Sequence, residues 1–485
     1  MKKKMMKKIV ALALTFVMVM SLAACGNSGG GDTGSTSDTQ DTADTSDTAD
    51  AADTADAADT ADAADTADTA DAESTDASDA EYGMDKNLSG KITIWTWGDY
   101  EIKGSSKFND YYPNIELEFV QFDSGEYFEK VVTTLASGGE MPDVVLFESG
   151  VRGQFLAMED TWEVLNAAPY NADTSELLDW ALPLCTNTNG DLLCVQVDNC
   201  VGAWAYDRNL TKKYFGTDDP AELEARFQTI DDYVEAAKEI AEKGNGEDFI
   251  FGGAGDIKDA IRGLYTQEPW VTDGKITLDT SYKKVYEVVD ELVSTGAVGK
   301  YVAWTPAWNA SWSAGHTVFT GCPTWYASHV LKSNDTESEG RWGLITPPGG
   351  GYSNGGTAYA IPKVIDESQK ELAWAWIKYL TMSLEGAENF YEAHTTPTLY
   401  KPAYEGDLYA GEPDPFFGGQ NIMQKYLEIA QNPNTKARVV TKYDGTLELI
   451  DNEILVQMGE GNMHADEAYA KLKADMIAAA PELTE

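Results

Sequence analysis

Apolar and polar positions alternate with two different periods between residues 90 and 147. Residues 91–97 and 115–120 place apolar side chains at every second position or in β-branched and aromatic runs, which predicts strands. A third short apolar run at residues 143–147 follows a proline. Between the last two runs, one apolar face at helical spacing predicts a helix that carries Phe128, Val131, Val132 and Leu135. Strands that alternate with helices predict an α/β fold, with a parallel sheet covered by helices.

The N-terminus has the pattern of a secretory signal. Five lysines within residues 2–8 precede a short apolar run at residues 9–20, and Leu22-Ala23-Ala24-Cys25 follows it. The apolar run is too short to span a bilayer as a helix. Cysteine directly after Leu-Ala-Ala resembles the bacterial lipobox, which implies cleavage before Cys25 and a diacylated thiol that holds the protein on a membrane. We therefore expect residues 1–24 to be a signal peptide. An ordinary secretory signal, with Cys25 there by chance, is the alternative.

A long acidic tract follows. Aspartate recurs at every third position from Asp38 to Asp71 among threonine and alanine, and no lysine or arginine lies between Lys8 and Lys86. A segment with little apolar surface and one sign of charge cannot offset the entropy of ordering. Residues 25–85 are thus predicted to be a lipidated cysteine plus a disordered Asp/Thr/Ala linker. A solvating stalk is the favoured role, and a binding site for a basic partner is the alternative.

The charge balance narrows the class of partner. The chain of 485 residues has a formal net charge of −46, and the acidic excess continues beyond the linker. Nucleic acid is not expected as a partner, because binding its phosphate backbone depends on lysine and arginine. The roughly 400 residues after the linker are too many for one ordinary core, so we expect two lobes.

Four cysteines remain after Cys25: Cys185, Cys194, Cys200 and Cys322. No Cys-x-x-Cys or Cys/His cluster marks a metal site, and neither a metal nor another cofactor is expected. Cys185 and Cys194 flank a turn-forming segment at residues 187–191. A hairpin disulfide and free buried thiols are both open, because spacing alone cannot fix cysteine geometry.

The ends of the predicted strands are rich in aromatic and acidic residues. Open α/β sheets bind ligands beyond the carboxyl ends of their strands. Those ends offer Trp97 and Asp99, then Asp123, then Phe147 and Glu148. A sugar ring has apolar faces and a rim of hydroxyl groups, so an aromatic ring suits the face and carboxylates suit the rim. We therefore expect these residues to bind ligand, while a capping role is the alternative for either aspartate.

Tryptophans supply further candidates. Trp304, Trp308, Trp312 and Trp325 lie in loop-like sequence rich in Pro, Asn, Ser and Gly, and we expect two of the four to stack on ligand. Trp270 is a weaker candidate of the same kind. Packing within loops is the alternative role.

Many short motifs, in order along the chain, resemble those of one known family. They are Ile92 to Asp99, Tyr112 to Ile115, Leu135 to Gly138, Met141 to Val145, Asn189 to Leu192, Trp204 to Leu210, Thr229 to Tyr233, Ala314 to His316, Gly321 to Trp325 and Trp342 to Pro402. Each motif is weak alone, but together they cover nearly all of the chain after the linker. They resemble the extracellular solute-binding proteins of ABC transporters, in the branch that contains maltose-binding protein and other sugar-binding proteins.

The resemblance implies the fold. It predicts an α/β chain in two lobes of the periplasmic-binding-protein type, with a hinge and a ligand cleft between the lobes. The chain would cross between lobes near Asp198-Asn199-Cys200, after Gly355-Gly356, and near Glu405. Lobe 1 would comprise residues 86–199 and 357–405, and lobe 2 residues 200–356 and 406–485.

The resemblance also implies binding positions. Asp99 falls after the first strand, Phe147 and Glu148 after the Pro-Asp strand, and Trp325 after the Gly-x-x motif of the second lobe. The crossings add Asp198, Asn199 and Gly356, and Asn354 would supply an amide to a hydroxyl group. Cys194 and Cys200 depart from the usual pattern, which leaves the hinge-side contacts open.

The implied function is the capture of a carbohydrate, an oligosaccharide, for an ABC importer. The partners would be the sugar, the permease subunits and the membrane, reached through the lipid on Cys25, and the protein would be a monomer. It would sit on the extracellular face of the cytoplasmic membrane of a Gram-positive-type envelope. The alternatives are a secreted glycoside hydrolase, a surface glycan adhesin, and an ABC binding protein for another small polar solute. We expect that the protein is not an enzyme, since the sequence has no His-Glu-x-x-His motif and its four histidines are scattered.

Overall fold

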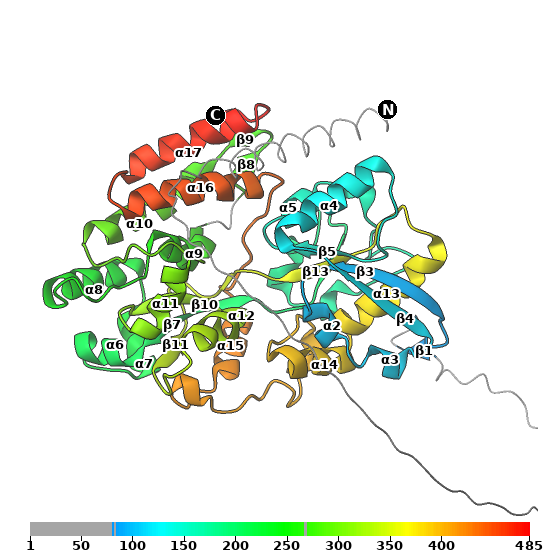
Figure 1. Ribbon diagram of the computed structural model, residues 1–485, viewed down its shortest axis with the longest axis horizontal. Coiled ribbons are helices and arrows are strands. Elements are labelled where there is room, and N and C mark those ends of the chain that lie inside the picture. Colours follow the sequence, from blue (N-terminus) through cyan, green and yellow to red (C-terminus); the bar gives the residue numbers. More distant parts are fainter. Residues whose placement is uncertain (1–79, 82–83, 266–268) are drawn as a thin grey trace, which may run out of the picture.

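The computed structural model of the protein describes residues 80–81, 84–265 and 269–485 (Figure 1). The predicted signal peptide, Cys25 and nearly all of the predicted linker lie outside the described residues. Two lobes stand side by side, one coloured mostly blue, cyan and yellow and the other mostly green and red. No helix in the described ranges is long and apolar enough to cross a membrane.

The first lobe is built on a mixed sheet. Its strand β3 (Gly90–Thr96) pairs in parallel with β4 (Ile115–Gln121). A parallel bridge from the middle of β3 brings β5 (Val145–Glu148) to its other side. β13 (Thr357–Ala360) then pairs antiparallel with both β5 and β6 (Val195–Gln196). The strands and the parallel pairing predicted from the apolar pattern are confirmed, and a distant part of the chain adds the antiparallel strand.

Helices pack around this sheet. They are α2 (Tyr100–Gly104), α3 (Phe108–Tyr111), α4 (Ser124–Ser137), α5 (Arg152–Leu156), α13 (Glu367–Met382) and α14 (Leu384–His394). The predicted helical face of α4 is buried at Val131 and Val132, and α13 packs directly on β3. The βα pattern seen in the sequence therefore folds as expected.

The second lobe is built around β7 (Val201–Asp207). β10 (Phe319–Pro323) lies on one side of it, with β11 (Trp342–Ile345) and β12 (Tyr352–Ser353) on the other, and all three pair antiparallel to it. Every residue of β7 is buried. Its odd-numbered apolar residues face one core cluster and its aromatic even-numbered residues face another, because successive strand residues point to opposite faces. β7 therefore separates the two cores.

The α-helices of the second lobe all follow β7 among the described residues. They are α6 (Arg208–Phe215), α7 (Pro220–Arg226), α8 (Ile230–Lys243), α9 (Ala254–Tyr265), α10 (Tyr282–Ser294), α11 (Pro306–Ala314), α12 (Thr324–Tyr326), α15 (Ile422–Gln431), α16 (Asp444–Gly459) and α17 (Ala465–Ala479). Two short hairpins complete the description: β1 (Ala80–Glu81) with β2 (Met84–Asp85), and β8 (Val271–Thr272) with β9 (Lys275–Ile276).

The expectation that the tryptophans near residue 310 lie in a loop is wrong. Trp308 and Trp312 lie on α11. The Thr305 side chain accepts the backbone N–H of Trp308, Pro306 occupies the first helical position, and Gly315 ends the helix with a φ of 77°. Proline at the start and glycine at the end mark helix boundaries, and these boundary residues give the segment its loop-like composition.

Two backbone segments cross between the sheets side by side. Residues 197–200 lead from β6 to β7, and residues 354–356 lead from β12 to β13. The backbone N–H of Asn354 donates to Cys200 O at 3.0 Å, so the crossings are bonded to each other. A third segment, between α15 and α16, passes lobe 1 so closely that a Cβ on Gly153 would meet Thr441 O at 2.1 Å.

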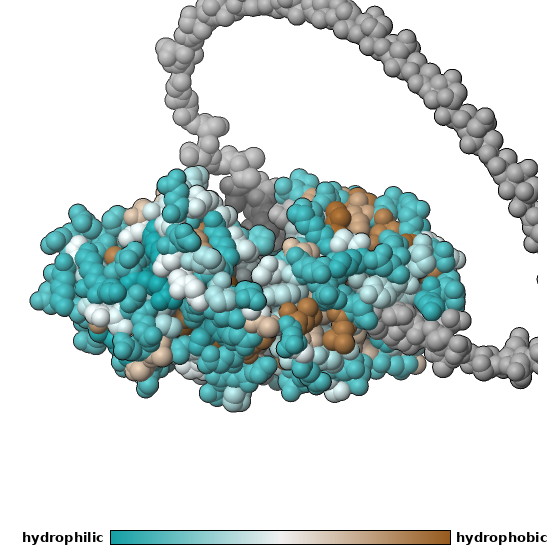
Figure 2. Space-filling view, turned by 90° about the horizontal axis from the view of Figure 1, so that it is seen from below, coloured by the Kyte–Doolittle hydropathy of each residue, from teal (hydrophilic) through white to brown (hydrophobic). Residues whose placement is uncertain are grey.

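The four cysteines after Cys25 are all buried free thiols. Cys185 and Cys194 are the pair for which spacing alone left a disulfide open. Here Cys194 Sγ lies 3.9 Å from the carbonyl oxygen of Cys185. The surface seen from below is mostly hydrophilic, with apolar residues in small groups (Figure 2).

Candidate functional site

A cleft of about 850 Å³ lies between the two lobes. The ends of β3 and β5 supply its wall on lobe 1. Helices α9, α11, α12 and α16 supply residues from lobe 2, and the segments that cross between the lobes supply the rest. The side of the cleft built by lobe 1 is the carboxyl end of its parallel strands, which is where open α/β sheets bind ligands.

Most of the residues predicted to bind ligand line this cleft. They are Trp97, Asp99, Glu148, Asp198, Trp308, Trp325, Asn354 and Gly356, and Trp304 joins them. They come from both lobes and from both crossing segments, so only the folded chain brings them together.

Five predicted residues lie away from the cleft: Asp123, Phe147, Asn199, Trp270 and Trp312. Phe147 is fully buried, and its ring centroid lies 4.8 Å from that of Phe155. Successive strand residues point to opposite faces, so Phe147 faces the core while Glu148 faces the cleft. Asp123 is exposed before α4.

The other three are held by structural contacts. Asn199 is buried and donates its side-chain amide to Tyr404 Oη at 2.8 Å. Trp270 is buried and donates its indole N–H to Asp444 Oδ1 at 3.2 Å. Trp312 is buried behind Trp308, with ring centroids 5.2 Å apart. Their aromatic or amide groups serve packing in this conformation.

Three tryptophans form an aromatic wall on the lobe 2 side. Trp304 stacks on Trp325 with a centroid distance of 6.0 Å and an interplanar angle of 16°, and its ring lies 5.1 Å from that of Trp308. Trp304 is 63% exposed and has a φ of 68°, a backbone region that a bulky residue occupies only at a cost. A large exposed apolar ring on a strained backbone is typical of a ligand platform.

The backbone beside this wall is shaped to fit it. Trp325 donates its indole N–H to Asn354 O at 2.9 Å. Gly355 has a φ of 99°, and a Cβ there would lie 2.6 Å from the same indole nitrogen. Only glycine lets the crossing segment pass this close.

Charged residues of α9 and α16 form a second part of the lobe 2 wall. Asp256, Asp259 and Arg262 follow one another at three-residue spacing on α9, and Glu448 reaches them from α16. Glu448 binds Arg262 at 2.9 Å and the buried Lys258 at 2.7 Å. Burial opposes ionisation of Glu448, but the two cations hold its pKa well below its usual range.

Asp256 is the least satisfied acid of this wall. Its Oδ1 accepts the indole N–H of Trp308 at 2.9 Å, and its Oδ2 is buried with no hydrogen-bond donor among the described residues. Burial raises the pKa of Asp256 to about 7, and the charge of Asp259 adds to the rise. A buried acceptor without a donor costs about 1–3 kcal/mol.

Two buried groups hold the hinge side of the cleft. Asp198 accepts the backbone N–H of Thr357 at 2.8 Å and the hydroxyl of Tyr100 at 3.3 Å. Arg152 donates to Gly356 O at 2.5 Å and to the side chain of Gln196. These bonds tie both crossing segments to lobe 1.

The charged wall of α9 and α16 is not among the residues predicted from the sequence. Asp256, Asp259 and Arg262 could have been found, because three charged residues at three-residue spacing lie close to one face of a helix. Glu448 carries no local signal, since it reaches the wall from far along the chain. No group of three or more His, Cys, Asp or Glu is arranged to hold a metal ion in the ranges that the structure describes.

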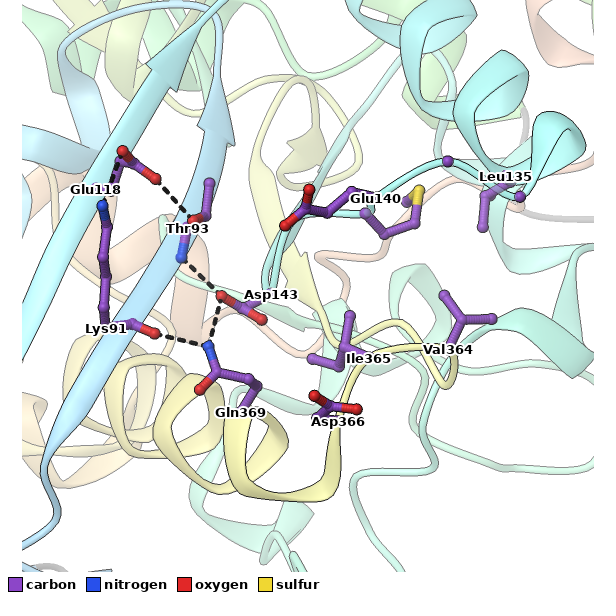
Figure 3. A pocket seen from close by; sticks show the side chains of 13 residues that line it. Lys91, Thr93, Glu118, Leu135, Glu140, Asp143, Val364, Ile365, Asp366 and Gln369 are labelled. Atoms are coloured by element: carbon purple, nitrogen blue, oxygen red, sulfur yellow. Dashed lines mark hydrogen bonds and ion pairs between the residues drawn. The ribbon is translucent and has the colours of Figure 1, made fainter.

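A second depression, of about 750 Å³, lies on lobe 1 away from the cleft (Figure 3). Its polar side chains largely bind one another: Glu118 accepts from Lys91 and Thr93, and Asp143 accepts from Thr93 N and from Gln369. Because these groups are already paired, the interlobe cleft is the stronger candidate for a ligand site.

The family follows from a comparison with known families. Residues 105–415 match the family described as bacterial extracellular solute-binding protein. The chain belongs to this family. The resemblance seen in the sequence and the predicted two-lobed fold of the periplasmic-binding-protein type are both confirmed.

Solved structures show the same fold for this solute-binding protein. A crystal structure of an extracellular solute-binding protein of family 1 is 22% identical, with a TM-score of 0.73, and the match covers 80% of this chain and 99% of that one. The galacto-N-biose/lacto-N-biose I-binding protein from Bifidobacterium longum is 18% identical, with a TM-score of 0.64 and coverage of 81% and 98%. The sugar-binding protein MalE from Xanthomonas citri is 16% identical, with a TM-score of 0.64 and coverage of 80% and 97%. No curated protein matches the chain.

The burial of Asp256 predicts a pH-dependent stability of the empty solute-binding protein. A carboxyl group whose pKa rises on folding binds more protons in the folded state, so its contribution to stability is lost as pH rises from about 4 to about 7. Asp256→Asn removes this titration. The free energy of unfolding of the variant minus that of the wild type should therefore increase by roughly 1–3 kcal/mol when the pH rises from about 5 to about 8.

Urea unfolding of both proteins at the two pH values measures the effect. Asp160→Asn, at an exposed position, is the matched control and should show no such change. An equal difference between Asp256→Asn and the wild type at both pH values would show that burial does not control this group.

Proposed function

We propose that this solute-binding protein captures a carbohydrate, an oligosaccharide, in the interlobe cleft and delivers it to the permease of an ABC importer. The observation that carries the proposal is the stacked pair Trp304 and Trp325, which shares one cleft with carboxylates from both lobes. Aromatic faces cover the C–H faces of a pyranose, and carboxylates accept hydrogen bonds from its hydroxyl groups.

The energetics of such a site are adequate. A ring that buries ~80 Å² of apolar surface at ~25 cal/mol/Å² contributes roughly 2 kcal/mol. Two such rings with several charge-assisted hydrogen bonds reach about 8 kcal/mol after the costs of association, which corresponds to micromolar affinity. The cleft volume of about 850 Å³ also suits a ligand larger than one sugar ring.

The structural neighbours support the same class of ligand. The Bifidobacterium longum protein was solved in complex with lacto-N-biose. A binding protein from B. animalis subsp. lactis was solved with β-1,6-galactobiose, and one from Listeria monocytogenes with cycloalternan. All of these ligands are oligosaccharides.

The proposed mechanism is closure of the two lobes around the ligand. The crossings at residues 197–200 and 354–356 would act as the hinge, with the lobes divided as the sequence predicts. Ligand contacts made by both lobes would favour the closed state over the open one. The closed protein would then bind the permease, while the transporter's ATPase hydrolyses ATP and this chain catalyses no reaction.

We further propose that the lipid on Cys25 holds the protein on the extracellular face of the cytoplasmic membrane, in a Gram-positive-type envelope. The acidic linker would let a monomeric two-lobed body reach the permease, because a long self-repelling chain extends over tens of ångströms.

A glycan panel tests the central proposal. At least one oligosaccharide should raise the melting temperature of the purified protein, because binding to the folded state alone stabilises it. Small-angle scattering with that ligand should show a smaller radius of gyration. The recovered ligand should be chemically unchanged, since shortened sugars would instead indicate a glycoside hydrolase. A panel in which no glycan binds would contradict the proposal.

Trp325→Ala should weaken binding of that glycan by about 2 kcal/mol, or roughly 30-fold, because it removes one face of the stacked platform. Isothermal titration calorimetry measures the change. Trp180→Ala is the matched control, because Trp180 is partly buried in lobe 1 outside the cleft and its loss should lower stability without lowering affinity. Equal affinities of the Trp325 variant and the wild type would assign Trp325 to packing.

Cys25→Ala should release the protein from the membrane, because the acyl chains have no thiol to attach to. Fractionation of cells into membrane and medium measures the distribution, and the purified variant should bind sugar as the wild type does. Cys322→Ala, which removes a buried thiol of the body, is the control that should stay in the membrane fraction. A membrane-bound Cys25→Ala protein would contradict lipid anchoring.

A further inference from the structure

Acidic groups outnumber cationic ones around the cleft. Of the residues that line it, one is a lysine or arginine in the described part of the chain, namely Arg262. The carboxylates that line it are Asp99, Glu148, Asp198, Asp256, Asp259 and Glu448. Arg262 is engaged by Glu448, and it lies 3.8 Å from Asp259. The one positive charge on the wall is therefore already balanced.

Neighbouring lysines balance some of the other carboxylates but not all of them. Lys103 pairs with Asp99 at 2.6 Å, and Lys258 pairs with Asp259 at 3.2 Å. Glu148, Asp198 and Asp256 have no lysine or arginine within ion-pair distance among the described residues. Glu148 and Asp198 accept hydrogen bonds from neutral donors on both of their oxygens. Asp256 alone of the three has an oxygen left over.

The free oxygen of Asp256 is a second observation that points to a ligand. The residue is 6% exposed, it lines the cleft, and its Oδ2 has no donor in the described part of the chain. The charged groups nearest to it are Asp259 and Lys258, and Lys258 is committed to Glu448 and Asp259. Other groups around it are neutral: they include Trp308, Tyr326 and Gly252, where an added Cβ would lie 2.7 Å from Asp256 Oδ2. Among the described residues, no cation lies within ion-pair distance of Asp256, and the more distant charge of Lys258 offsets its burial only in part.

The aromatic wall suits the same kind of group. The faces of Trp304 and Trp325 carry negative quadrupole potential, and a cation near such faces is attracted to them. A hydroxyl group would give Asp256 a donor but no charge. A protonated amine would give it both, with three N–H donors to share among the carboxylates.

We propose that the captured solute carries a protonated amino group, as an oligosaccharide with an unacetylated amino sugar does, and that Asp256 receives this group while the tryptophan wall covers the sugar ring. The inference rests on the proposed carbohydrate function and names the chemical class of the sugar. It also gives a reason for a buried carboxylate that lowers the stability of the empty protein.

Three matched disaccharides test the inference. β-1,4-linked disaccharides of glucosamine, N-acetylglucosamine and glucose share one skeleton and differ at C2, where they carry an ammonium, an acetamido or a hydroxyl group. Calorimetry at about pH 7, where both the ammonium form of the amine and the ionised form of Asp256 are populated, should give the glucosamine compound at least about tenfold higher affinity than the other two. Added salt should reduce this preference, because it screens the charge interaction.

Two variants test whether Asp256 causes the preference for the glucosamine compound. Asp256→Asn should reduce the affinity ratio of the glucosamine to the glucose compound to within about threefold. Asp160→Asn, the same substitution at an exposed position outside the cleft, should keep the full ratio. Equal loss of the ratio in both variants would show that overall charge, rather than Asp256, causes it.

The outcomes separate the inference from the proposed function. Glucosamine compounds that bind no better than their neutral counterparts, or a neutral panel glycan that binds while every amine-bearing glycan fails, would overturn the inference and leave the carbohydrate function standing. A protein that binds no glycan, with or without an amine, would overturn the proposed function. Binding of spermidine without any sugar would keep amine recognition and overturn the carbohydrate assignment.

Discussion

Two backbone segments cross between the lobes, and a pair of buried polar side chains fixes where they cross. Arg152 donates to the carbonyl of Gly356 and to Gln196, while Asp198 accepts the backbone N–H of Thr357. Each group satisfies a buried partner that would otherwise be left without one, so removing either is costly. Because both crossings are held to lobe 1, a hinge motion has to be absorbed in the few residues between these bonds and the sheet of lobe 2.

The contents of the cleft follow from this constraint. Gly355 and Gly356 have φ values of 99° and 104°, and a Cβ at either would collide with Trp325 or Gln196. The second crossing therefore runs directly beside the tryptophan wall, and the position of Trp325 depends on the same segment that we propose as part of the hinge. A change in lobe orientation would move the aromatic wall relative to the carboxylates of lobe 1. In the proposed mechanism, ligand contacts and lobe closure would thus be coupled through a short piece of backbone.

Local patterns predicted most of the fold but only part of the site. The period-two runs form β3 and β4. Residues just beyond the strand ends, such as Asp99, reach the cleft, because the direction of a strand determines which edge of the sheet its last residues occupy. The sequence could not separate Trp325, which lines the cleft, from Trp270, which is buried against Asp444, because aromatic residues suit a core and a sugar site equally. Glu448 could not be predicted from the sequence, because its partners on α9 lie far from it in the chain and only the tertiary fold brings them together.

The acidity of the chain and the acidity of the cleft act at different distances. At physiological ionic strength, charges farther than about 8 Å are largely screened, so most of the net charge of −46 cannot add to the affinity for a bound solute. It can raise the rate at which cationic solutes arrive, because steering acts before contact. Affinity and selectivity must come from groups inside the cleft, where Asp256 sits beside indole rings in a poorly hydrated wall. Low hydration strengthens a charge pair and also penalises an unpaired charge, so the same burial that destabilises the empty site favours a ligand that brings the missing charge.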